Sequence, residues 1–82
     1  MAKKKKLPHN EEYYLQKLGE RLKQLRTEAG YTNYETFAFD HELSRSHYGK
    51  QEKGRNITFA SLVRILKALD IDFQEFFSEG FD

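Results

Sequence analysis

A short run of polar and basic side chains follows Ser44, and these side chains have the chemistry to read a nucleic acid. Arg45, Ser46 and Lys50 are expected to face outward on a helix that opens at Ser44. An arginine guanidinium can donate two parallel hydrogen bonds to O6 and N7 of guanine, which discriminates between bases by about 1–3 kcal/mol. Serine can donate or accept, lysine can reach guanine or a phosphate, and His47 can donate to either at the edge of the same surface. The plainer interpretation of each is a solvated surface group, so base reading by Arg45, Ser46, His47 and Lys50 is a prediction.

A wider set of residues could hold backbone phosphates around that surface. Helix N-termini offer free N–H groups and a partial positive charge, and basic side chains neutralise phosphates directly. Helix capping is the alternative role for the hydroxyl residues of the set, and the lysine run is either an arm along the duplex or a solubilising tail. Glycine at position 49 either lets the helix approach the DNA backbone or is only a weak helix position. The predicted phosphate contacts are Thr32, Asn33, Tyr34, Ser44, Gly49, Lys53, Arg55, Asn56, Thr58, Lys3, Lys4, Lys5 and Lys6.

Two short helices joined by a tight corner are expected to position these side chains. Residues 32–35, Thr-Asn-Tyr-Glu, have the form of a capping box and predict the start of a helix that buries Phe37 and Ala38. The corner falls at residues 41–43, and the next helix runs from its cap at Ser44 to Gly54. Such a helix-turn-helix lays its second helix in the major groove of DNA.

Three further helices are expected to form the scaffold. Asn10 is a plausible N-cap of a first helix that ends at Gly30, with leucines at 15, 18, 22 and 25 on one face and close packing at Gly19. Thr58 is expected to cap a fourth helix, and Asp72 a short fifth one. The expected apolar face of the fourth helix consists of Phe59, Leu62, Val63, Leu66 and Leu69.

The phenylalanines at 73, 76, 77 and 81 have two possible roles. They could form a dimer surface, but a chain this short needs aromatic side chains to close its core, so most of them are expected inside. Phe81, beyond Gly80, is the best candidate for an exposed contact with a partner.

Length and composition predict a single all-α, compact five-helix domain. It is expected to span residues 10–79, with a flexible basic arm at 1–9 and a C-terminal tail at 80–82. The 82 residues leave little room for a deep enzyme cleft, and the chain has no cysteine. No apolar run approaches the roughly 18–20 residues of a membrane span, so we expect a cytoplasmic protein. The histidines at 9, 41 and 47 share no metal-ligand spacing, and we expect no cofactor, no metal and no enzymatic activity.

The charge distribution favours a polyanionic partner more than the formal net charge of +1 does. Residues 44–55 carry four basic residues against one acidic residue, and residues 1–30 carry eight against four. Residues 70–82 hold five acidic residues and no basic one. The acidic segment should therefore point away from a polyanion that binds the basic segments.

Three segments together give a family resemblance. LGERLKQLRTEAGYT, FAFDHELSRSHYGKQEKG and TFASLVRILKALDID follow one another with the spacing of the phage repressor/Cro-type helix-turn-helix family, also called lambda-repressor-like. The resemblance covers roughly residues 15–77. It also implies an ion pair between Arg26 and Glu52, which would tie the reading helix to the scaffold. The chain departs from the pattern at Glu42, where the family often has glycine, and at His41 and Gln51, where apolar residues are usual.

The resemblance implies a sequence-specific regulator of transcription, acting as a repressor. Its partner would be double-stranded DNA, bound by a homodimer on a two-fold operator. The alternative is a protein-interaction module, such as an antitoxin-like partner protein, which uses the same fold to hold another protein. The acidic, aromatic C-terminal segment is the feature that would carry this second function.

Overall fold

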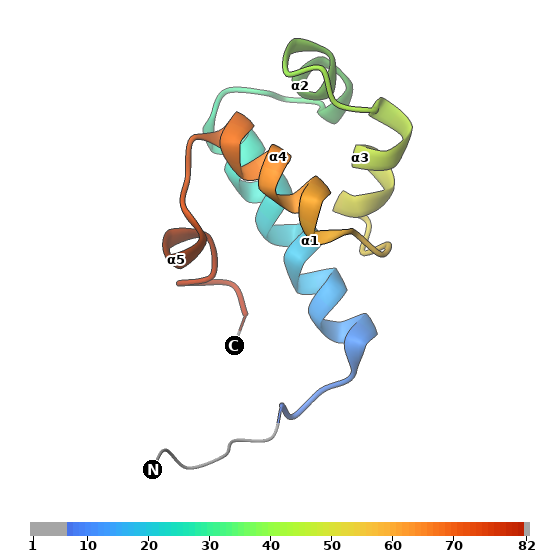
Figure 1. The fold of residues 1–82 in the computed structure, drawn as a ribbon, viewed down its shortest axis with the longest axis vertical. Helices are drawn as coiled ribbons and strands as arrows, with labels where there is room; N and C mark the ends of the chain where they lie inside the picture. Colours follow the sequence, from blue (N-terminus) through green and yellow to red (C-terminus); the bar gives the residue numbers. More distant parts are fainter. Residues whose placement is uncertain (1–6, 82) are drawn as a thin grey trace.

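The computed structural model describes residues 7–81, and this part of the chain contains five helices and no strand. The all-α prediction is therefore confirmed. Figure 1 shows how the five helices of this part of the chain are arranged. The helices are α1 (Glu11–Glu28), α2 (Tyr34–Asp40), α3 (Arg45–Glu52), α4 (Phe59–Leu69) and α5 (Phe73–Phe76). The predicted lysine contacts at positions 3–6 lie outside the described residues.

Polar side chains start the helices by accepting a hydrogen bond from a free backbone N–H of the first turn. Asn10, Ser44, Thr58 and Asp72 do this for α1, α3, α4 and α5, as predicted. The prediction is wrong for α2, whose N-cap is Asn33 and not Thr32. The Asn33 side-chain oxygen accepts from the N–H of Thr36 at 2.8 Å. Both residue types cap helices well, and asparagine is the stronger of the two.

The corner between α2 and α3 is closed by a residue in a left-handed conformation. Glu42 has φ 57°, as its place in the usual glycine position implied. This geometry lets the N–H of Leu43 donate to the carbonyl of Ala38 at 2.8 Å. The strain at Glu42 is thereby offset by a turn that fixes the direction in which α3 begins.

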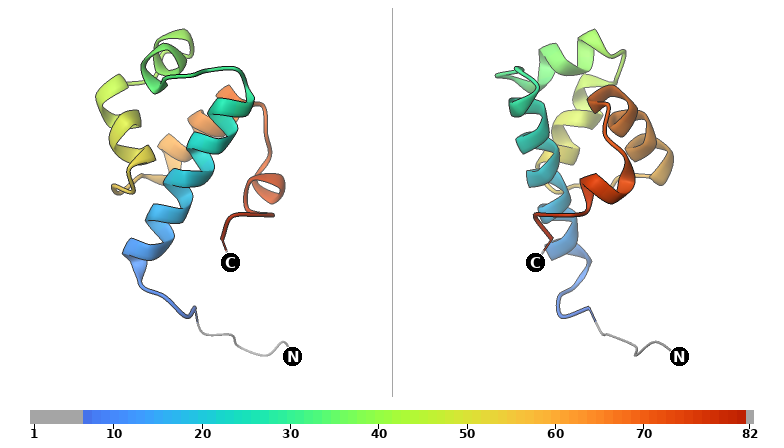
Figure 2. Two further views of the ribbon diagram at one scale, coloured as in Figure 1. Left: turned by 180° about the vertical axis from the view of Figure 1, so that it is seen from behind. Right: turned by 90° about the vertical axis from the view of Figure 1, so that its left-hand side faces the viewer.

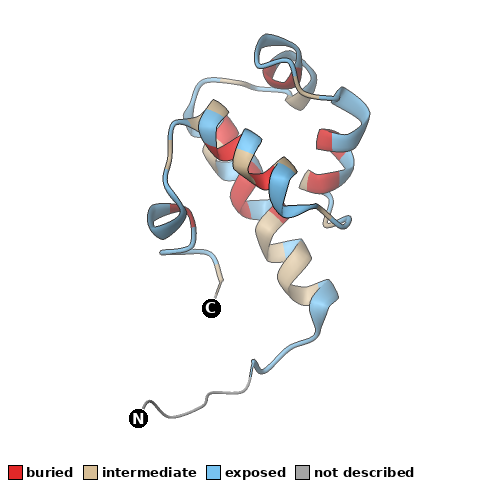
Figure 3. Ribbon diagram, viewed as in Figure 1, coloured by how far each residue is buried: buried red, intermediate tan, exposed pale blue. Residues whose placement is uncertain are grey.

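Within residues 7–81, a core of eight buried apolar side chains holds the helices together. Figure 3 shows buried segments on every helix, facing the interior. The prediction that Phe59 belongs to this core is wrong, because its side chain is 70% exposed and Ile65 is buried in its helix instead. The core residues are Leu22, Phe37, Ala38, Tyr48, Leu62, Ile65, Leu66 and Phe76.

Arg21 fastens the C-terminal segment to α1. Its Nε donates to the carbonyl of Phe76 at 2.8 Å, and its Nη2 donates to the carbonyl of Glu75 at 3.0 Å. Its Nη1 also pairs with Glu79 at 3.0 Å. The guanidinium therefore satisfies carbonyls at the end of α5 that have no partner within the helix. In Figure 1 and in the reverse view of Figure 2, α5 lies on the opposite side of α1 and α4 from α3. The acidic segment accordingly lies away from α3, as predicted.

The C-terminal phenylalanines divide differently from the prediction. Phe76 is buried, but Phe73 and Phe77 are exposed. Phe81 is half-buried and packs against Phe76 and Phe77, so it is less exposed than predicted. Phe73 instead stacks on Phe59, with ring centres 5.3 Å apart and ring planes 11° apart. These two rings form an exposed aromatic pair where α4 and α5 begin.

Candidate nucleic-acid interface

One side of α3 carries polar side chains into solvent while the other side is buried. Arg45, Ser46, His47 and Lys50 are exposed, whereas Tyr48 is 1% exposed. Within residues 7–81, no side-chain hydrogen bond or ion pair engages Arg45 or Lys50. The structure therefore brings the four predicted base-reading residues onto the exposed part of one helix, and leaves both cations available to a ligand.

An internal ion pair anchors the buried side of α3 to α1. Arg26 Nε donates to Glu52 Oε2 at 2.7 Å, and Arg26 Nη2 donates to Glu52 Oε1 at 3.0 Å. Both side chains are almost completely buried, with 5% and 6% exposed. Arg26 Nη1 also donates to the carbonyl of Tyr31 at 2.8 Å. The hydrogen bonds to Glu52 raise the pKa of Arg26 above its ordinary value. The pair implied by the family resemblance is confirmed.

Gly19 allows α1 and α3 to approach each other closely. A Cβ atom at this position would lie 2.5 Å from the carbonyl oxygen of Glu52 and 2.7 Å from that of Gln51. Because both neighbours are backbone atoms, only glycine fits without moving a helix. The close packing predicted at Gly19 is confirmed, and together with the ion pair it fixes where α3 stands.

Tyr48 fills the space beside the Arg26–Glu52 pair. Its hydroxyl is buried, and within the described part of the chain it makes no hydrogen bond of good geometry. Burial, and secondly the neighbouring Glu52 carboxylate, raise the pKa of Tyr48 well above its ordinary value. Tyr48 therefore remains a neutral core residue and takes no part in contacts outside the protein.

The beginning of α2 lies against the middle of α3. Thr32 and Asn33 are exposed, whereas Tyr34 is half-buried. The Tyr34 ring occupies the space where a Cβ atom of residue 49 would stand, at 2.5 Å. Gly49 is itself buried. The missing side chain of Gly49 therefore makes room for an aromatic ring of the same protein, and the close approach of Gly49 to DNA stays a prediction.

The segment between α3 and α4 presents the remaining predicted phosphate contacts. The side chains of Lys53, Arg55, Asn56 and Thr58 are exposed. Thr58 is also occupied locally, because its hydroxyl caps α4 and bonds to Ser61. Asn56 accepts a hydrogen bond from the N–H of Ile57 at 3.0 Å. Lys53 and Arg55 are the two unoccupied cations of this segment among the described residues.

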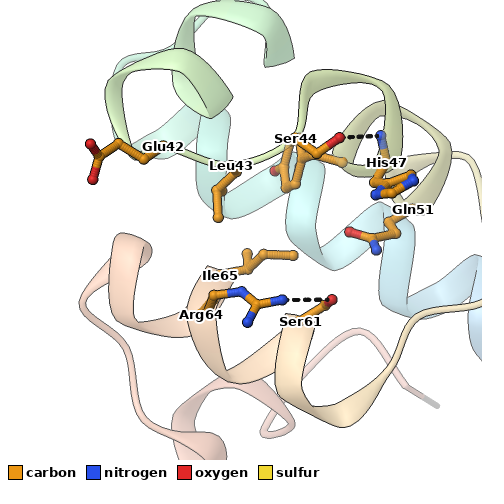
Figure 4. Close-up of a pocket in the computed structure, with 9 residues that line it drawn as sticks. Glu42, Leu43, Ser44, His47, Gln51, Ser61, Arg64 and Ile65 are labelled. Carbon is orange, nitrogen blue, oxygen red and sulfur yellow. Dashed lines mark hydrogen bonds between the residues drawn. The ribbon is translucent and has the colours of Figure 1, made fainter.

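A polar cavity between α3 and α4 was missed by the sequence reasoning. It has a volume of about 280 Å³ and lies beside the first turn of α3. Figure 4 shows Arg64 of α4 and Gln51 of α3 pointing into the same space from facing helices. Arg64 is exposed and carries no acidic partner within residues 7–81. Nothing in the local sequence distinguishes it from any surface arginine of an amphipathic helix, since its neighbours come from another part of the chain.

Among residues 7–81, no group of three or more histidines and acidic residues could hold a metal ion. No helix of residues 7–81 has the length and apolar character needed to span a membrane.

Comparisons with known proteins agree with this geometry. Residues 22–76 match a family model described as helix-turn-helix. The chain is 36% identical over 64 residues to control protein C.MunI from Mycoplasma sp, covering 77% of this chain and 86% of the relative. A solved structure, the restriction-modification controller protein C.AhdI from Aeromonas hydrophila, is 42% identical and superposes with a TM-score of 0.68. That match covers 77% of this chain and 96% of the controller protein.

The matched family segment contains α2, α3 and α4 whole, which are the elements that carry the exposed cations and their scaffold. The resemblance to repressor and Cro proteins is thereby confirmed. The chain belongs to the helix-turn-helix family of Cro/C1 type, and it is a DNA-binding regulator of transcription.

Proposed function

We propose that this regulator controls the genes of a restriction-modification system and that it recognises its operator with the exposed side of α3. The name of the solved relative supports the biological role, because that protein is a restriction-modification controller. The observation that carries the recognition is the pair of unengaged cations, Arg45 and Lys50, on a helix whose other side is locked to the scaffold. Arg45 and Lys50, with Ser46 and His47, would contact base edges in the major groove.

Phosphate contacts on both flanks of α3 would hold the helix in the groove. The exposed start of α2 at Thr32 and Asn33 can offer its hydroxyl and amide groups on one flank. Lys53 and Arg55 can neutralise phosphates beyond the end of α3. Such contacts set the register of the protein on the duplex, while the residues of α3 provide the discrimination between sequences.

We propose further that two copies bind a two-fold operator. A single module of this size contacts few base pairs, and a symmetric dimer doubles the contacts without a new surface on the DNA side. The exposed pair of Phe59 and Phe73 supports self-association, because large stacked rings in water gain free energy when a second copy covers them. Repression would follow from occlusion of the promoter by the bound dimer.

The test is a binding measurement with DNA selected from a random pool at about 150 mM salt. Fluorescence anisotropy with the selected duplex should give a tight complex for the parent. Removing two base contacts, in Arg45→Ala combined with Lys50→Ala, should weaken binding by about 2–6 kcal/mol. Lys67→Ala is a control for loss of a cation, since Lys67 is exposed on α4 beside Asp70, Asp72 and Glu75.

The outcome also separates this function from the protein-interaction alternative. A groove of about 900 Å³, lined by α1, Phe77 and Phe81, is the feature that favours a protein partner. If the Arg45 and Lys50 variant folds normally and binds the selected DNA as the parent does, the DNA-reading role of α3 is wrong and the groove becomes the better candidate.

A further inference from the structure

The cavity between α3 and α4 has the character of a site for a ligand with hydrogen-bond acceptors. Gln51 lines it from α3 and is only 9% exposed. Its carboxamide makes no hydrogen bond within the described part of the chain. Because the residue is largely enclosed while its amide still reaches the cavity, the N–H groups of Gln51 can donate to a ligand held there.

The opposite wall of the cavity supplies a positive charge. Arg64 projects from α4, and within residues 7–81 its guanidinium makes a single long hydrogen bond, of 3.4 Å, from Nη2 to the hydroxyl of Ser61. The Ser61 hydroxyl also points into this space, as Figure 4 shows. Three groups therefore converge on one space: the Arg64 guanidinium, the Gln51 amide and the Ser61 hydroxyl. Groups of these kinds bind phosphates in proteins.

The acidic residue at the rim does not cancel this charge. Glu42 belongs to the lining of the cavity, but Figure 4 shows its carboxylate turned away from Arg64, Ser61 and Gln51. The imidazole of His47 stands beside Gln51 in the same view and offers a further donor. The amide and the hydroxyl can donate or accept, and the one formal charge that faces the interior is the guanidinium of Arg64, which favours an anion over a cation.

We infer that this cavity is a phosphate site and that its occupant is a backbone phosphate of the bound operator. The inference rests on the proposed function, because the cavity adjoins the first turn of the helix that reads the DNA. His47 lies on α3 next to Ser46 and also lines the cavity, so a duplex that reaches Ser46 brings its backbone close to Arg64. Arg64 and Gln51 are thus phosphate-binding residues that fix the depth of α3 in the groove.

Two substitutions test the site without damaging the core. Arg64 is exposed, so Arg64→Ala leaves the packing intact; Gln51→Leu replaces the amide with an apolar group of similar size. Each variant should bind the selected duplex about tenfold more weakly than the parent, as expected for loss of a hydrogen bond to a charged group. For Arg64→Ala, the slope of log K against log salt should also fall by about 0.9. Lys67→Ala is the control, since it removes the same charge from the same helix.

A chemical change on the DNA gives an independent measurement. A series of duplexes, each with one neutral methylphosphonate in place of a phosphate, should contain a position that weakens binding of the parent but not of Arg64→Ala. Titration of inorganic phosphate without DNA, followed by the NMR signals of the Gln51 amide, tests the other source of a phosphate group. Saturation of the cavity by inorganic phosphate, combined with unchanged DNA affinity in both variants, would assign it to a free anion and overturn the inference.

The possible failures are distinguishable. If the parent enriches no duplex from the random pool, the proposed function is wrong and the DNA assignment of the cavity is wrong with it. If the parent binds specifically but both variants match Lys67→Ala in affinity and salt slope, only the cavity assignment fails. Thermal melts of all three variants verify that a loss of binding is not a loss of fold.

Discussion

The buried ion pair between Arg26 and Glu52 gives the sharpest stability prediction. In Glu52→Ala, the guanidinium of Arg26 loses both hydrogen bonds to the carboxylate and retains only the Tyr31 carbonyl at 2.8 Å. Arg26 is 4% exposed, so its charge remains in a poorly solvated place without a counter-charge. Removing one partner of such a pair costs about 3–5 kcal/mol. A domain of this length has a total stability of about 4–12 kcal/mol, so the variant should lose much of it.

Urea unfolding followed by circular dichroism measures this loss directly. The midpoint for Glu52→Ala should fall steeply while the slope with denaturant is retained. Glu20→Ala is the matched control, because its pair with Lys17 is long, at 4.0 Å, and exposed, so it should cost less than about 0.5 kcal/mol. The double variant Arg26→Met with Glu52→Ala should recover part of the stability, since no isolated charge remains. Equal midpoints for Glu52→Ala and the parent would refute the reasoning.

The remaining predictions concern packing, pH and salt. Gly19→Ala should lower the unfolding free energy by about 1–3 kcal/mol in urea melts, because the new methyl group meets backbone carbonyls that cannot move aside. Gly49→Ala should lower it less, because the neighbouring Tyr34 ring can rotate. Equal costs for the two variants would contradict this reasoning. Tyr48→Phe should be as stable as the parent at pH 7, because the lost hydroxyl has no good partner. Above pH 10 an unfolded tyrosine ionises while Tyr48 stays protonated, so parent stability should fall by up to about 1.4 kcal/mol per pH unit from this group, and Tyr48→Phe should lose that part of the slope. Trimming residues 1–6 should flatten the salt dependence of DNA binding, and an identical slope would exclude phosphate contacts by the lysines. Phe73→Glu should reduce self-association in sedimentation without loss of helix content, and an unchanged mass would exclude the aromatic pair as the contact between copies.

The local features of the fold were predictable because they depend on short stretches of sequence. Ser44 and Thr58 predict where α3 and α4 begin, because their hydroxyl groups cap free N–H groups of the first turn. The left-handed conformation of Glu42 follows from its place in the motif. Capping preferences did not identify the N-cap of α2, because Thr32 and Asn33 are adjacent and both residue types cap helices well. The order of the helices followed from these boundaries and from the apolar stripes between them.

Features that depend on contacts between distant segments were not predictable in the same way. The apolar stripe of α4 is wide enough to include Phe59, and only its packing shows that Ile65 faces inward while Phe59 stacks on Phe73. The sequence does not show that Gly49 is covered, because the ring that packs against it belongs to Tyr34 of another helix. The same limit applies to Arg64 and Gln51, since no single stretch of sequence contains both walls of their cavity.

The binding constant of Arg45→Ala combined with Lys50→Ala for the selected operator, measured beside the parent at one stated salt concentration, tests the central claim most directly. The account predicts that the double variant folds as the parent does, loses about 2–6 kcal/mol of specific binding, and retains weak nonspecific binding through its phosphate contacts. Specific binding equal to that of the parent would contradict the assignment of α3 as the reading helix.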